Sequence, residues 1–197
     1  MLIGLYFGSF NPVHNGHLII ASHILNTGLA DEIWFVVSPQ NPFKNSAGLL
    51  NQNHRLHLVQ VAIDGELNMK ASNIEFKLPK PSYTITTLTY LEEKYSKQQF
   101  AIVMGSDGFQ NIGKWKNAEA ILNNYQIIIY RRPGFVINEQ QPERIHIVDA
   151  PLLEISSTHI RTLIREKKSI RYLVPDAVKK EIEEENYYAS SLENPTK

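Results

Sequence analysis

Two histidines lie three positions apart in a glycine-containing segment near the N-terminus. The segment reads GSFNPVHNGH over residues 8–17 and contains His14 and His17. Residues at this spacing lie on one side of a helical turn, and a helix N-terminus adds free N–H groups and positive potential. Two imidazoles and these amides together could bind phosphate oxygens. The structural alternative is that one histidine caps the helix while the other is packed.

The glycines of this segment favour the close approach of a ligand. Gly8 can take backbone angles that other residues avoid, and Gly16 removes a side chain between the two histidines. A zinc site is a further possibility for HxxH, but no third ligand with suitable spacing is evident, so we predict no metal site. The glycine fingerprints of dinucleotide-binding and P-loop proteins are both absent, which argues against hydride transfer and P-loop ATPase activity.

A second candidate segment reads EISSTHIR over residues 154–161. Either Ser156 or Ser157 can serve as the N-cap of a following helix. Arg161 comes one turn after Ser157, so its guanidinium can reach back over the same helix end. Hydroxyls, free amides and a cation would then converge on one anion. The structural alternative is an ordinary capped helix with a solvated arginine.

A third candidate segment reads MGSDG over residues 104–108. The carboxylate of Asp107 suits a ribose hydroxyl pair or Mg²⁺, although Gly and Asp are also common in turns. Trp115 could stack on a flat ring or be packed. Lys44 is a lone cation on a proline-containing loop, for which a solvated side chain is the default interpretation.

The chain alternates between expected strands and expected helices. Apolar runs predict strands at 2–7, 32–38, 73–76, 100–104, 125–130 and 144–148. Helical spacing and end signals predict helices at 17–26, 53–64, 83–95, 118–123, 157–167 and 175–186. Strands separated by helices imply a parallel sheet covered on both faces, which binds ligands beyond the carboxyl ends of its strands. The candidate segments all follow expected strands, so we expect them to meet.

Composition excludes several classes of protein. The 197 residues include 20 Lys and Arg and 20 Asp and Glu, a balance that argues against a general nucleic-acid binder or a polybasic membrane protein. There is no cysteine, which excludes thiolate chemistry. No apolar run is long enough for a membrane span and no signal peptide is evident, so a cytoplasmic location is expected. We expect one domain over 1–186, helical from about 151, and a surface tail over 187–197.

Two of these segments resemble the signatures of the nucleotidylyltransferase superfamily, HNGH at 14–17 and ISSTHIR at 155–161. Within it the chain resembles the bacterial nicotinate-nucleotide adenylyltransferases. That likeness extends from about Leu2 to Val178 and is carried by NPFK at 41–44, PSYTITTL at 81–88, GSD at 105–107 with Trp115, RRPG at 131–134 and YLVP at 172–175. Asn11 and Phe43 stand where many members have Asp and His, so we assign no catalytic carboxylate at position 11.

The resemblance implies an α/β fold, a Rossmann-like doubly wound parallel sheet with a small C-terminal helical part. It also implies a reaction of NAD biosynthesis. The phosphate of nicotinate mononucleotide would attack the α-phosphorus of ATP, giving nicotinate adenine dinucleotide and pyrophosphate without a covalent enzyme intermediate. Mg²⁺ would be carried mainly by ATP.

The resemblance further implies a role for each candidate residue. The catalytic set would be His14, His17, Lys44 and Arg161, which contact the phosphates of ATP. The other ATP-binding residues would be Gly8, Ser9, Phe10, Gly16, Gly105, Asp107, Arg132, Ile155, Ser156, Ser157 and Thr158. Thr84 and Trp115 would lie on the acceptor side, with Trp115 a candidate to stack on the pyridine ring.

Two other interpretations stay open at this point. One is a sister enzyme that uses nicotinamide mononucleotide or phosphopantetheine as the acceptor. The other is a nucleotide-binding regulator without turnover. The sequence does not indicate an oligomeric state.

Overall fold

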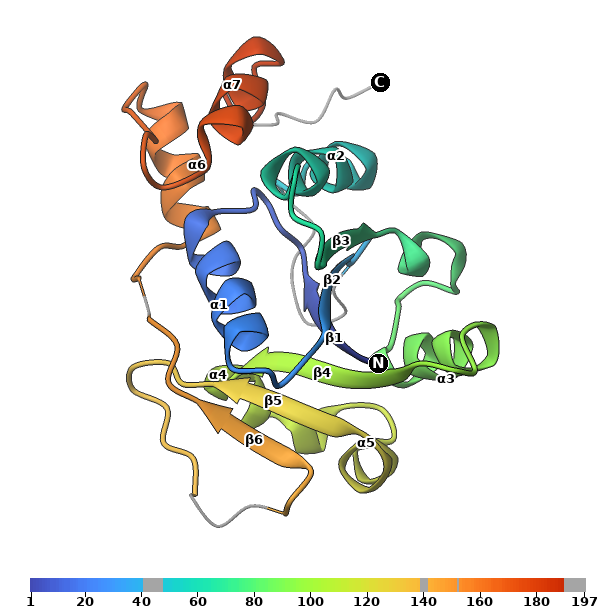
Figure 1. Ribbon diagram of the computed structural model, residues 1–197. Helices are drawn as coiled ribbons and strands as arrows, with labels where there is room; N and C mark the ends of the chain where they lie inside the picture. The colour runs from blue at the N-terminus through green and yellow to red at the C-terminus, as the bar shows by residue number, and fades with distance from the viewer. Residues whose placement is uncertain (41–47, 139–141, 152, 190–197) are drawn as a thin grey trace.

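Six parallel strands form one sheet at the centre of the protein (Figure 1). A computed structural model describes residues 1–40, 48–138, 142–151 and 153–189. The strands lie in the order β3-β2-β1-β4-β5-β6. Their bounds are Leu2–Gly8 for β1, Glu32–Val37 for β2, Met69–Ser72 for β3, Gln99–Gly105 for β4, Gln126–Tyr130 for β5 and Ile145–Val148 for β6. This arrangement confirms the predicted doubly wound sheet, and its switch point lies between β1 and β4.

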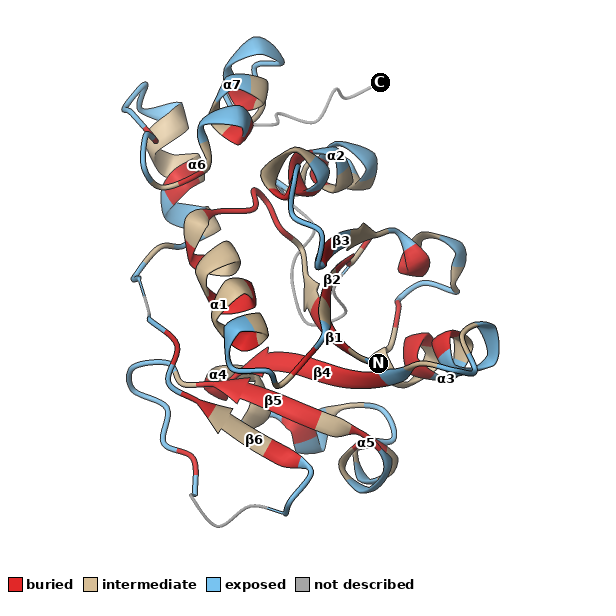
Figure 2. Ribbon diagram, in the orientation of Figure 1, coloured by how far each residue is buried: buried red, intermediate tan, exposed pale blue. Residues whose placement is uncertain are grey.

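The central strands are buried because helices cover both faces of the sheet (Figure 2). Successive residues of β1 point to opposite faces: Leu5 packs into one apolar cluster and Tyr6 into the other. The parallel register sets Gly8 beside Val37 and Gly105 beside Tyr130. The carboxyl ends of four neighbouring strands therefore meet at one edge.

The helices divide between the two faces according to which apolar cluster they join. α1 (Asn15–Asn26), α2 (Gln52–Ala62), α6 (Ser157–Arg165) and α7 (Asp176–Glu184) contribute to one cluster. α3 (Thr84–Lys94) and α5 (Ala118–Asn124) contribute to the other, with the short α4 (Ser106–Phe109) and the 3-10 turns η1 (Ile74–Lys77) and η2 (Ile112–Lys114). Among the helices of the described ranges, none has the length and apolar character needed to cross a membrane.

The strand predicted at 73–76 is wrong. β3 pairs with β2 four residues earlier, from Met69 to Ser72, and the chain then leaves the sheet. Asn73 has φ −99° and ψ 21°, and η1 follows it directly. The apolar residues Ile74 and Phe76 alternate as they would in a strand, but this short pattern also fits a 3-10 turn packed against the sheet.

The C-terminal helices lie at one end of the molecule, beside α2 (Figure 1). His57 Nε2 of α2 lies 3.3 Å from Glu181 Oε2 of α7. The hydroxyl of Tyr187 lies 2.5 Å from Nδ1 of His54, and Tyr188 also packs against the core. These two tyrosines are the first residues of the tail expected over 187–197; residues 190–197 lie outside the described ranges.

Candidate active site

A cavity of about 490 Å³ opens at the carboxyl ends of β1, β4 and β5, beside the switch point of the sheet. This volume falls within the range of small-molecule sites. Most of the predicted site residues line it: Gly8, Ser9, Phe10, His17, Thr84, Gly105, Asp107, Trp115, Arg132, Ile155, Ser156, Ser157, Thr158 and Arg161. His14 and Gly16 are not in the described lining, but the His14 ring stacks on that of His17 and Gly16 lies against His14. Lys44 lies outside the described residues.

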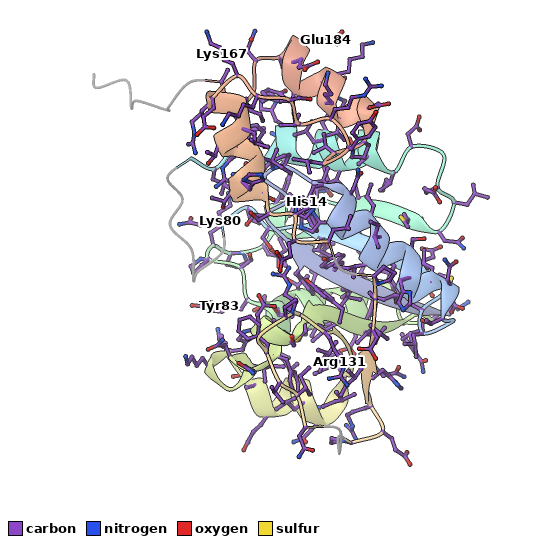
Figure 3. The ribbon with its side chains drawn as sticks, turned by 90° about the vertical axis from the view of Figure 1, so that its left-hand side faces the viewer. His14, Lys80, Tyr83, Arg131, Lys167 and Glu184 are labelled. Carbon is purple, nitrogen blue, oxygen red and sulfur yellow. The ribbon has the colours of Figure 1, made fainter. Side chains whose placement is uncertain are left out.

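The two signature histidines stack on each other at the start of α1. Their ring centroids are 3.7 Å apart with an interplanar angle of 25°. His14 occupies the N-cap position, and its backbone N–H donates to Nδ1 of His17 at 3.2 Å. Because Nδ1 accepts this bond, the neutral ring of His17 carries its proton on Nε2. Figure 3 shows His14 close to where the ribbons of α1 and α6 meet.

His14 is held as a neutral imidazole. Its side chain is buried, and its Nδ1 has no hydrogen-bond partner among the residues that the structure describes. Burial, and after it the positive charge of Arg132, lower the pKa of His14 from 6.5 to about 4. The structural alternative was that one histidine caps the helix while the other is packed. His14 does occupy the cap position, but His17 lines the cavity.

The two glycines of the first segment make room for neighbouring side chains. A Cβ at Gly16 would lie 3.1 Å from Nδ1 of His14. The lack of a side chain at Gly16 therefore makes room for the imidazole ring of His14, whereas the sequence predicted room for a ligand. A Cβ at Gly8 would lie 2.7 Å from the ring of Phe10. Phe10 has φ 46° and buries its ring, so its main chain lines the cavity while its side chain belongs to the core.

The N-terminus of α6 faces the same cavity. Ser156 is the N-cap and accepts a hydrogen bond from the His159 N–H at 3.2 Å, which decides between the two expected caps. Ser157 Oγ donates to the Pro12 carbonyl at 2.9 Å. Arg161 donates from Nη1 to the Asn11 carbonyl at 2.8 Å. The second signature is therefore anchored to the loop of the first, and two helix N-termini point into one space.

A polar cluster joins the ends of β4 and β5. Arg132 Nη1 lies 3.4 Å from Asp107 Oδ2, and its Nη2 donates to the Tyr130 hydroxyl at 3.3 Å. The Arg132 backbone N–H donates to Ser106 Oγ at 2.8 Å. The nearby tyrosines and Asp107 raise the pKa of Arg132 against the effect of burial. Asp107 and Arg132, which were predicted separately as ATP-binding residues, are thus brought together at the place where Gly105 leaves no room for a side chain.

Another part of the cavity lining is aromatic and includes the start of α3. Thr84 is the first residue of that helix, and Tyr83 is its N-cap. Trp115 follows η2 and lines the same wall. The ammonium of Lys116 lies 4.7 Å from the centroid of the Tyr83 ring. Flat rings and a free helix N-terminus suit a ligand that combines an aromatic ring with an anionic group.

Two buried charged residues of this region, Arg55 and Glu75, were not predicted from the sequence. Arg55 in α2 is fully buried, and its guanidinium donates to the carbonyls of Ser9, Ser38, Pro39 and Leu50. Burial lowers the pKa of Arg55 to about 10, so it stays protonated at neutral pH. Glu75 in η1 lines the cavity and is also buried. A charged residue in a polar helix or turn is normally solvated, so its sequence does not predict burial. The one sequence signal for Glu75 is the PSYT segment at 81–84, which contains its partner Ser82.

The charges around the cavity are mixed and lean positive. Among the described lining residues, Lys116, Arg132 and Arg161 are cations, while Glu75 and Asp107 are carboxylates. Both carboxylates already have partners, since Asp107 pairs with Arg132 and Glu75 accepts hydroxyl hydrogen bonds. A Rossmann-like sheet with anion-binding helix ends and an aromatic wall at its switch point defines a nucleotide-binding protein.

Comparisons with known proteins agree with this class and narrow it. The model of the cytidylyltransferase-like family matches residues 5–163. A Flavobacterium psychrophilum protein named "Probable nicotinate-nucleotide adenylyltransferase" is 47% identical, covering 95% of this chain and 99% of that protein. A Cytophaga hutchinsonii protein of the same name is 46% identical, covering 96% and 100%. The chain belongs to the cytidylyltransferase-like family and, within it, to the nicotinate-nucleotide adenylyltransferases.

Solved structures show the same fold. The nicotinic acid mononucleotide adenylyltransferase of Plasmodium falciparum complexed with NaAD superposes with a TM-score of 0.82. That match covers 98% of this chain and 99% of the other at 23% sequence identity. A second structure of that protein, complexed with APC, gives a TM-score of 0.79 at 22% identity.

Proposed function

We propose that the protein transfers the adenylyl group of ATP to nicotinate mononucleotide, giving nicotinate adenine dinucleotide and pyrophosphate in NAD biosynthesis. One observation carries this proposal: His17 of α1 and the N-terminus of α6 line one cavity, and Thr84 and Trp115 line the same cavity. The names of relatives at 46–47% identity support nicotinate mononucleotide as the acceptor, in preference to nicotinamide mononucleotide or phosphopantetheine.

The reaction is an in-line displacement at phosphorus. A 5′-phosphate oxygen of the acceptor forms a bond to the α-phosphorus of ATP, and the bond from that phosphorus to the bridging oxygen of pyrophosphate breaks. The protein therefore needs to position two phosphates and stabilise the charge between them. In our proposal, His17 donates from Nε2 to the α-phosphate or bridging oxygen. Its neighbour His14 holds it in place by stacking and by the backbone hydrogen bond.

The departing pyrophosphate is assigned to the N-terminus of α6. Ser156, Ser157 and Thr158 bring the first N–H groups of this helix to the cavity. Arg161 uses Nη1 for the Asn11 carbonyl and Nη2 for the Thr158 hydroxyl, and it keeps further N–H donors for phosphate. Lys44 is proposed as a further phosphate ligand from its sequence alone.

The nucleoside of ATP is assigned to the edge formed by β1, β4 and β5. The main chain of Gly8, Ser9 and Phe10 would line the adenylate, and Asp107 and Arg132 would face the ribose. Both carboxylates of the described lining are already paired, so we propose that Mg²⁺ enters bound to the phosphates of ATP and to water.

The acceptor is assigned to the aromatic wall. Trp115 is proposed to stack on the pyridine ring, and Thr84 at the start of α3 to contact the acceptor. The free N–H groups of that helix end would favour an anionic substituent on the ring. A cytoplasmic location stays a prediction of the sequence.

A pyrophosphate-release assay with three acceptors tests the proposal. Purified protein with Mg-ATP is offered nicotinate mononucleotide, nicotinamide mononucleotide and phosphopantetheine separately, with a reaction lacking acceptor as the blank. We expect acceptor-dependent release mainly with nicotinate mononucleotide and formation of the dinucleotide by mass. Release mainly with another acceptor would replace the proposed substrate, and release with none would contradict the activity.

A further inference from the structure

A buried carboxylate with an unusual set of partners lines the acceptor side of the cavity. Glu75 is 2% exposed and lies in the lining beside Ser82 and Thr84. A buried carboxylate is costly unless hydrogen bonds or a counter-charge compensate it. Here hydroxyl groups provide the compensation.

Three hydroxyl side chains from separate segments hold the Glu75 carboxylate. Ser82 Oγ donates to Oε2 at 2.8 Å, and Thr87 Oγ1 donates to Oε1 at 3.0 Å. Ser38, which directly follows β2, provides a third side-chain hydrogen bond. Burial raises the pKa of Glu75 while these hydrogen bonds act against that rise. Glu75 therefore ties together the end of β2, the loop before α3 and the first turn of α3.

The start of α3 has no side-chain cap of its own, and the Thr86 and Thr87 N–H groups donate to the Tyr83 carbonyl. Tyr83 is the N-cap, with φ −114° and ψ 136°, and its side chain makes no capping hydrogen bond. Ser82 comes just before that cap, and Thr87 lies one turn into the helix. Tyr83 and Thr84, both of which line the cavity, lie in the sequence between Ser82 and Thr87, the two residues that donate to Glu75.

We propose that Glu75 is a positioning residue for the acceptor half of the reaction. Its carboxylate fixes the first turn of α3, so that Thr84 and the free N–H groups of that turn meet the acceptor in one geometry. This inference rests on the proposed function, because the affected substrate is the nucleotide acceptor and not ATP. Fixed geometry lowers the entropic cost of binding, so its loss raises the KM of one substrate.

The variant Glu75→Gln tests this role with little change in size. An amide nitrogen cannot accept a hydroxyl hydrogen bond, so part of the cluster is lost. Thr87→Val removes one of the donors, keeps the shape of its side chain and provides a second, milder variant. Glu92→Gln is the matched control, because Glu92 lies on the same helix and accepts a hydroxyl hydrogen bond from Tyr125 at 2.8 Å but does not line the cavity.

Two measurements are made on each variant. Hydrogen exchange of the unliganded protein over residues 83–90 reports on the start of α3 without any substrate. Steady-state kinetics give separate KM values for acceptor and ATP. We expect Glu75→Gln to speed exchange over 83–90 and to raise the acceptor KM at least about tenfold, the effect of losing one strong hydrogen bond. Thr87→Val should do the same to a smaller extent, while ATP KM and the control variant should match wild type.

Each outcome decides the proposal. Unchanged exchange over 83–90 in both variants overturns it, even if the wild-type protein proves inactive with nicotinate mononucleotide. Faster exchange with unchanged KM values, or with equal rises for acceptor and ATP, also overturns it, because a merely structural role has that signature. If Glu75→Gln does not fold, Thr87→Val decides by the same criteria. The three-acceptor assay on wild type separately decides the proposed function.

Discussion

Arg161 donates a hydrogen bond from Nη1 to the carbonyl oxygen of Asn11 at 2.8 Å. These residues lie 150 positions apart: Asn11 precedes the first signature in the segment 8–17, and Arg161 ends the second signature. The bond orients the planar guanidinium, so its remaining N–H groups have a defined direction. It also explains why the two segments act as one site: the start of α6 is fastened to the loop that leads into α1.

Replacing Arg161 by Ala is expected to weaken ATP use more than folding. The loss of a charge-assisted contact to phosphate lowers kcat/KM for ATP by about 10- to 100-fold. Steady-state kinetics at varied ATP measure this. The control is Arg165→Ala, one turn further along α6, where the exposed guanidinium contacts Thr162 and does not line the cavity. Equal effects of both variants would contradict the assignment of Arg161.

Replacing His17 by Ala is expected to reduce turnover while the fold stays intact. A preorganised donor to the reacting phosphate contributes about 2.7–4 kcal/mol, so kcat falls by about 10²- to 10³-fold. Circular dichroism with thermal unfolding checks the fold, and pyrophosphate release measures kcat. His23→Ala, in the last turn of the same helix, is the control and should retain wild-type turnover. Near-normal turnover of folded His17→Ala would refute the role.

Replacing Gly8 by Ala is expected to destabilise the protein. The new methyl group would lie 2.7 Å from a ring carbon of Phe10, which is buried and cannot move freely. Such overpacking typically costs about 1–3 kcal/mol of unfolding free energy, measurable by urea titration. Gly113→Ala is the comparison, because a Cβ there would have no described atom within 4 Å apart from its chain neighbours. A Gly8→Ala protein as stable as Gly113→Ala would show that the loop adapts.

The buried neutral ring of His14 is expected to make stability depend on pH. Its pKa is about 4 in the folded protein and 6.5 in an unfolded chain, so between these values the unfolded chain binds more protons. This contribution is complete above pH 6.5 and is lost as the pH falls toward 4, a change of about 3 kcal/mol. Urea unfolding across this range measures it. His14→Gln should show a shallower slope, and parallel slopes would contradict the shift.

Local sequence patterns were sufficient for most of the elements but not for the region after β2. Apolar runs correctly predicted β1, β4 and β5, because a strand buried on both faces has to be apolar throughout. The strand expected at 73–76 failed because Ile74 and Phe76 alternate in both a strand and a 3-10 turn, and pairing with β2 chose Met69–Ser72 instead.

For the site, the sequence identified the residues at strand and helix ends but not their supports. His17, Asp107 and Arg161 belong to segments whose residue types are suited to phosphate or ribose, and the sheet brings them to one cavity. Glu75 and Arg55 lack such a local sign. Each is a charged residue in a short polar stretch, and its burial results from contacts with segments far away in the chain.

By itself, the sequence determined the alternation of strands and helices, the absence of cysteine chemistry and a phosphate-binding character in a chain whose charges sum to zero. The net charge of zero did not reveal where the charged side chains lie in the fold. Only the tertiary structure decided that Arg161 meets Asn11, that His14 is a neutral ring stacked on His17, and that hydroxyls from three segments hold Glu75. These facts depend on which distant groups share a space without water, since burial and long-range hydrogen bonds set protonation and orientation.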